Sequence, residues 1–168
     1  MRHPPGGAAV RAALVLAAAV ASVAAASRAS AAETKPPPAA TISILAIQAS
    51  TEDKPACDKE LAPIQSALAK SGHNTFRLIL RDARAVPYGT AWQREMAEGY
   101  SLSITAEEAT ANDVKLALVW TRTEKDKDGN PKVAELQRLP LTIRKGKYFL
   151  SGGWKLKKGA LLAAVSVQ

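Results

Sequence analysis

The chain has 168 residues, of which 47% are hydrophobic and 23% charged, and its formal net charge is +8. These values are typical of a globular protein of about one domain, and they exclude a chain kept disordered by its charge. One cysteine and two histidines exclude an intramolecular disulfide framework, a cysteine-rich zinc module and a metal site built from several histidines.

Residues 1–31 have the pattern of a secretory signal peptide. Arg2 and Arg11 precede an apolar run over residues 12–26, and small residues then lead up to Ala31. A retained membrane anchor is the alternative, but this run is shorter than the roughly 20 apolar residues that span a bilayer. We therefore expect a helical signal segment that is cleaved after Ala31, and a periplasmic or extracellular protein with no membrane span left after cleavage.

Cleavage at this point would remove three of the 23 basic residues and no acidic residue, which leaves a net charge of +5. No lipid-anchoring cysteine follows the cut, because the only cysteine is Cys57. Residues 32–40 contain three consecutive prolines, which enter neither a helix nor a central strand. We expect them to form an extended lead-in to a single β-rich domain over residues 41–168.

The first expected strand covers residues 41–49. It is rich in β-branched residues and apolar at both alternating sets of positions, with Ile42 and Ile44 on one face and Leu45 and Ile47 on the other. Such a pattern is typical of a strand buried on both sides.

One helix is expected over residues 58–71. Asp58 is suited to the N-cap position, and Gly72 is suited to end the helix. Its apolar stripe consists of Leu61, Ile64 and Leu68. Because the helix joins strand 41–49 to a strand over residues 75–81, we expect these two strands to be parallel neighbours.

A period of two residues then predicts a series of short strands. They cover residues 76–81, 90–96, 100–105, 114–121, 139–144, 148–151 and 160–167. Turn residues separate them at 87–89, 98–99, 128–131, 145–147 and 152–153. The expected fold class is α+β, mostly an antiparallel β-sheet or sandwich with one covering α-helix.

Cys57 and His73 are the most reactive side chains of the mature chain. The predicted helix places Cys57 at its N-terminal end, where the helix dipole lowers a thiol pKa. It places His73 past the other end, about 20 Å away, which disfavours a catalytic dyad. We predict no catalytic residue, and we expect Cys57 to be a structural thiol. An intermolecular disulfide or a redox modification of Cys57 is the alternative.

Residues 124–135 resemble a calcium-binding loop. Glu124, Asp126 and Asp128 alternate, Gly129 stands at the sixth position and Glu135 at the twelfth. The alternating pattern before this segment predicts a strand where the calcium-binding motif needs a helix. We therefore interpret the segment as a solvated hairpin tip, leave calcium-linked stability as an alternative, and expect no metal site and no cofactor.

Charge is unevenly distributed along the chain. Residues 136–168 hold seven basic residues and no acid. This basic third favours an anionic partner, and the expected contact residues are Arg144, Lys145, Lys147, Trp154, Lys155, Lys157 and Lys158. The expected partner is an anionic envelope component or an acidic protein surface, and no nucleic acid is expected. A solvated edge whose lysines discourage strand-to-strand aggregation is the alternative.

Residues 139–154 consist of a strand, a charged glycine turn, a second strand and a Gly-Gly pair. This segment resembles a hairpin of bacterial secretin pore proteins, and the overall layout resembles short exported bacterial proteins of unknown function. Neither resemblance implies a catalytic residue.

The sequence therefore predicts an exported, non-catalytic binding or structural domain of the cell envelope. The alternative is a small secreted hydrolase whose acidic residues converge from several strands.

Overall fold

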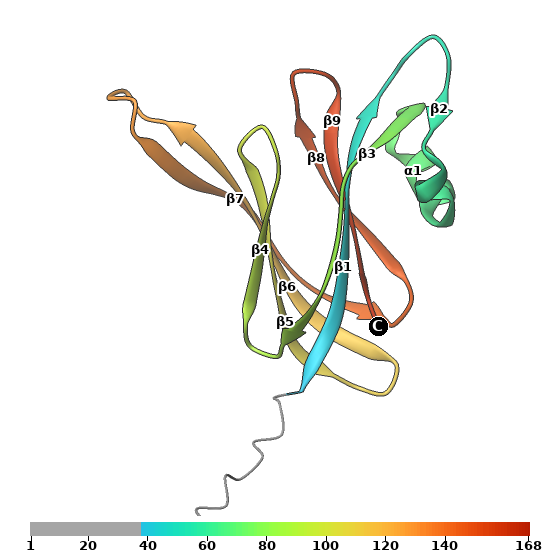
Figure 1. The fold of residues 1–168 in the computed structure, drawn as a ribbon, viewed down its shortest axis with the longest axis vertical. Coiled ribbons are helices and arrows are strands. Elements are labelled where there is room, and N and C mark those ends of the chain that lie inside the picture. Colours follow the sequence, from blue (N-terminus) through green and yellow to red (C-terminus); the bar gives the residue numbers. More distant parts are fainter. Residues whose placement is uncertain (1–37) are drawn as a thin grey trace, which may run out of the picture. The chain divides into compact units, whose positions relative to one another are not determined.

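A computed structural model describes residues 38–168, which form two β-sheets and a short helical segment (Figure 1). The predicted signal peptide and most of the predicted lead-in lie outside these residues. Sheet A has the strand order β2 (Ala56–Cys57), β3 (Thr75–Pro87), β1 (Ala39–Ser50), β9 (Ala160–Val167), β8 (Tyr148–Lys155). Sheet B has the order β4 (Ala91–Ala97), β5 (Tyr100–Ala109), β6 (Asp113–Lys125), β7 (Pro131–Arg144).

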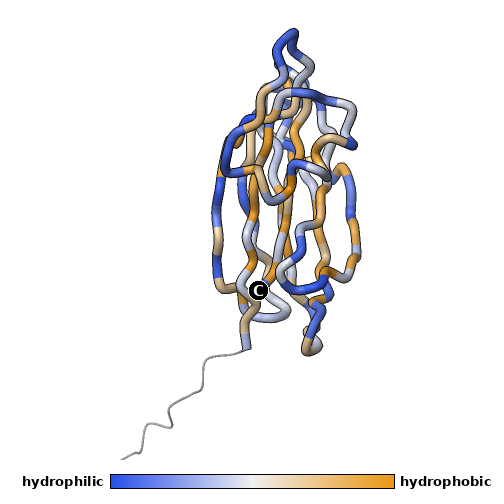
Figure 2. The backbone as a smooth tube through the Cα atoms, turned by 90° about the vertical axis from the view of Figure 1, so that its right-hand side faces the viewer, coloured by the Kyte–Doolittle hydropathy of each residue, from blue (hydrophilic) through white to orange (hydrophobic). Residues whose placement is uncertain are grey.

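The main core lies between the two sheets. Alternate residues of β1 and β9 face alternate residues of β5 and β6, and hydrophobic positions run along these central strands (Figure 2). The largest side chains of this core are fully buried, and they include Trp120, Ile42, Ile44, Leu102, Ile104, Leu116 and Leu118. A β-rich fold with mostly antiparallel pairing and one short helix is confirmed.

A second, smaller core lies on the other face of sheet A. It is formed by Leu45 and Ile47 of β1, together with Leu61, Ile64 and Leu68 of the helical segment. The prediction that strand 41–49 is buried on both faces is therefore confirmed, as is the apolar stripe of the helix.

The helical segment is less regular than the sequence predicts. A 3₁₀-helix over Lys59–Ile64 precedes the single α-turn of α1 (Gln65–Leu68), and a second 3₁₀-helix follows over Ala69–Ser71. Pro63 lies inside the first 3₁₀-helix and has no N–H to donate to an α-helical ladder. The carboxylate of Asp58 does not cap this segment but accepts the backbone N–H of Leu78 at 2.7 Å.

The expected parallel pairing of the first strand with strand 75–81 is wrong. β1 and β3 are antiparallel, with Ser50 opposite Thr75. The connection that contains the helical segment begins and ends at the same end of the sheet, so it does not cross over the sheet as a parallel connection must. The parallel partner of β3 is instead the two-residue strand β2.

The Gly152-Gly153 pair does not form a turn between strands. It lies inside β8, where the pairing with β9 shifts register between Gly152 and Trp154. Among the described residues, no helix is long and apolar enough to cross a membrane.

Candidate functional site

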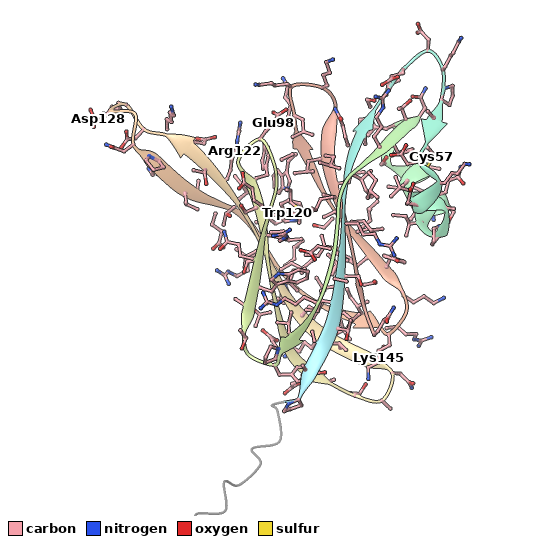
Figure 3. The ribbon with its side chains drawn as sticks, in the orientation of Figure 1. Cys57, Glu98, Trp120, Arg122, Asp128 and Lys145 are labelled. Atoms are coloured by element: carbon pink, nitrogen blue, oxygen red, sulfur yellow. The ribbon has the colours of Figure 1, made fainter. Side chains whose placement is uncertain are left out.

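Six of the seven basic residues of the C-terminal third form two separate clusters, and the seventh, Arg138, pairs with Glu135. Arg144 ends β7, and Lys145 and Lys147 follow in the turn before β8; we call these three the first basic cluster. Lys155 ends β8, and Lys157 and Lys158 lie in the turn before β9; we call these three the second basic cluster. The eight residues of β8 separate the clusters by about 25 Å, and the turns that hold them lie at opposite ends of sheet A (Figure 3). The structure thus does not gather the expected contact residues into one surface.

The two clusters differ in how far their charge is compensated. In the first cluster, Arg144 Nε lies 3.9 Å from an oxygen of Asp113, and Lys145 Nζ donates to the carbonyl of Thr110 at 3.0 Å. Lys147 and all three lysines of the second cluster are exposed, and within residues 38–168 no carboxylate lies at ion-pair distance from them. Four exposed lysines without an ion-pair partner among the described residues therefore stand at the two ends of β8, as other unpaired basic side chains do around the helical segment and on β3 and β7.

A shallow groove of about 350 Å³ lies between the edge strands β7 and β8. β7 contributes Gln137 and Leu139, and the opposite wall is Phe149–Gly152 of β8 with Leu162 behind it. This lining combines apolar Leu139, Phe149, Leu150 and Leu162 with polar Gln137 and Ser151, and it runs along the strand that joins the two basic clusters.

Trp154 does not form the exposed contact that its position beside Lys155 suggests. It is half-buried and packs on the main core, stacked on Tyr100 with ring centroids 6.4 Å apart and edge-on to Trp120 at 6.0 Å. Ser151 faces the core and accepts the indole N–H of Trp120 at 3.0 Å. An unbroken alternation from Ser151 would turn Trp154 outward, but the extra residue at Gly153 reverses it.

Cys57 and His73 line the same pocket, of about 350 Å³, beside the helical segment. The expectation that the helix holds them far apart is wrong, because β2 pairs with the start of β3 and brings Cys57 opposite Phe76. Burial, reinforced by the charge of Asp58, raises the pKa of the Cys57 thiol. The predicted lowering by a helix dipole is therefore wrong, and the thiol is a poor nucleophile near neutral pH.

The acidic segment at residues 124–130 is the tip of the β6–β7 hairpin. One carboxylate oxygen of Asp126 accepts the backbone N–H groups of Asp128, at 2.9 Å, and Asn130, at 2.8 Å. Strands flank the turn on both sides, as the hairpin interpretation predicts. The described residues contain no group of three or more His, Cys, Asp or Glu side chains arranged to hold a metal ion.

A groove of about 680 Å³ that is lined by polar side chains lies on sheet B, and the sequence did not predict it. Glu95 of β4 and Glu124 of β6 line it, together with Ser101 and Thr123. Its only sequence signal is the alternation of polar with buried apolar positions in β5 and β6. That pattern is equally typical of any solvated sheet face.

The chain matches no protein-family model, no curated protein and no solved structure. The function proposed next therefore depends on the residues and contacts described above.

Proposed function

We propose that the mature chain is an exported, non-catalytic binding domain of the cell envelope. The observation that carries this proposal is the set of exposed lysines without an ion-pair partner at both ends of β8, beside the groove between β7 and β8. Exposed lysines without a carboxylate partner attract anionic groups and raise their local concentration. The partner is accordingly an anionic envelope component or an acidic protein surface, met in the periplasm or outside the cell after export directed by residues 1–31.

A charge-reversal variant tests this function. Replacing all three lysines of the second basic cluster with glutamate should move the protein from the envelope fraction to the soluble fraction of lysed cells. A matched control reverses Lys54, Lys59 and Lys70, which are exposed around the helical segment and remote in sequence from β8. Equal fractionation of the two variants, with both melting at the wild-type temperature, would contradict the proposal.

Salt provides a second measurement on the unmodified protein. Raising ionic strength to about 1 M shortens the screening length to about 3 Å, so an association held by exposed lysines weakens steeply. Release of the wild-type protein from washed envelopes by salt is the expected result. An association that withstands salt and yields only to detergent would point to apolar anchoring instead.

A small secreted hydrolase is the second candidate, and one observation favours it. Glu95 and Glu124 come from different strands and line the same polar groove. A glycosidase likewise needs two carboxyl groups in one site, on either side of the bond that it cleaves. Glu124 also forms an ion pair with the guanidinium of Arg122, at 3.1 Å. Loss of an activity on oligosaccharides in both E95Q and E124Q, with the fold retained, would favour this candidate over the binding domain.

A further inference from the structure

We propose that β8 receives an extended strand of a partner protein, added to the open edge of sheet A, and that this strand is apolar in its middle and acidic at both ends. This inference depends on the proposed binding function and specifies its partner. It rests on the sheet order, on the composition of the two edge strands and on the positions of the basic clusters.

β8 is the last strand of sheet A and pairs on one side only within residues 38–168. From Tyr148 to Trp154 it contains no proline and no charged residue, and its regular edge runs from Tyr148 to Gly152, before the bulge at Gly153. An edge strand of this kind offers a row of unpaired backbone groups to an incoming strand.

The other long edge strand, β7, is protected in the ways that usually prevent strand addition. It contains Pro131 and Pro140, and it carries Lys132 and Arg138.

The outer strand β4 of sheet B carries Arg94 and Glu95, and the part of β3 that β2 leaves unpaired carries Arg81, Asp82 and Arg84. Among the described edge strands longer than two residues, β8 is therefore the one with neither charge nor proline between its ends.

Apolar side chains flank the open edge. Tyr148 at the start of β8 is 40% exposed, and Leu136, next to the groove residue Gln137 on β7, is 37% exposed. Phe149 and Leu139 line the groove between them. Alternate side chains of an added strand would reach these residues, which accounts for apolar residues in its middle.

Charge complementarity sets the ends of the partner strand. The basic clusters stand at the two ends of β8, so acidic residues at both ends of a strand about as long as β8 would meet both.

A second copy of this chain does not satisfy the site. Pairing β8 with another β8, in either direction, brings basic clusters against basic clusters. An anionic lipid surface could attract either cluster, but it makes no use of the uncharged edge between them.

Synthetic peptides test strand addition directly on the mature protein. The probe has two glutamates at each end of a short alternating Val-Thr strand, and its matched control is the same peptide with every central amide N-methylated. The two peptides carry the same charge and side chains, but only the first donates backbone hydrogen bonds. We expect the N-methylated peptide to bind at least tenfold more weakly. We also expect the probe to slow amide hydrogen exchange in β8 and not in β7.

Two outcomes would overturn strand addition. Equal binding of both peptides would show that charge alone holds them, and absence of protection in β8 would place the peptide elsewhere. Tighter binding to anionic phospholipid vesicles than to the probe peptide would also contradict strand addition. The charge-reversal fractionation described above could still succeed in each case, so the failure of this inference is distinguishable from the failure of the proposed function.

Discussion

The carboxylate of Glu98 accepts the backbone N–H of Lys157 through both of its oxygens, at 3.0 and 3.2 Å. Glu98 lies in the turn between β4 and β5 of sheet B, and Lys157 lies in the turn between β8 and β9 of sheet A. This contact joins the two sheets at the end where the second basic cluster stands. The contact also brings the negative charge of Glu98 beside that cluster. Glu98 forms no ion pair there, because its carboxylate contacts the backbone of Lys157 and not an ammonium group.

Removing the Glu98 carboxylate should destabilise the fold modestly. Glu98 has a φ of +51°, a conformation that costs a residue with a side chain about 1 kcal/mol and costs glycine much less. We expect E98A to lower the free energy of unfolding by about 1 kcal/mol, through the lost hydrogen bonds. E98G should lose less, because relief of backbone strain offsets part of that loss. Urea denaturation measures both, and E98G less stable than E98A would contradict the assigned conformation.

The hydrogen bond between Trp120 and Ser151 should matter more, because it is buried. Trp120 is fully buried and Ser151 is 8% exposed, so S151A leaves an indole N–H without a partner in the core. A loss of about 1–3 kcal/mol in the free energy of unfolding is expected. The control is S103A, at a half-buried position on β5, for which a change within about 0.5 kcal/mol is expected. Equal effects of the two substitutions would show that the hydrogen bond contributes little.

Hydrophobic periodicity predicted the strands in which apolar residues alternate strictly and the face they define is buried. The two faces of β1 and the stripe Leu61, Ile64 and Leu68 follow from spacing alone, because each lies within one regular element. Periodicity predicted β5, β6 and β8 too short by four or five residues, and it shortened most β3 and β7, whose ends carry charged side chains on both faces or prolines. There the pairing partner, rather than the local sequence, extends the strand.

The candidate site was harder to predict because it depends on irregular pairing. A single extra residue at Gly153 turns Trp154 into the core, and a two-residue strand brings Cys57 to the pocket of His73. Neither feature has a periodic signal. The basic composition of residues 136–168 was evident in the sequence, but its division between the two ends of β8 follows from the length and direction of that strand.

Gly159 should be among the residues least tolerant of substitution. Its φ is +79°, and a Cβ at this position would overlap the carbonyl oxygen of Ala49 on β1. G159A should therefore cost about 3 kcal/mol of unfolding free energy, from backbone strain and steric overlap together. Gly146 is the matched control, since its φ is +75° but a Cβ there would contact nothing. G146A should cost only about 1 kcal/mol, and thermal denaturation that ranks the two equally would argue against close packing of the β8–β9 turn on β1.

The thiol of Cys57 should make the stability of the protein fall at alkaline pH. Burial raises its pKa in the folded state, with a smaller contribution from Asp58, so the folded protein holds this proton to a higher pH than the unfolded chain does. The stabilisation is complete below the thiol pKa of the unfolded chain, and it is lost as pH rises through the raised value of the folded state. We expect C57S to lose less stability than the wild type between neutral and alkaline pH, and iodoacetamide to alkylate the folded protein more slowly than the urea-unfolded chain. Faster alkylation of the folded protein at neutral pH would instead indicate an activated thiol, and would direct attention to the imidazole of His73 in the same pocket.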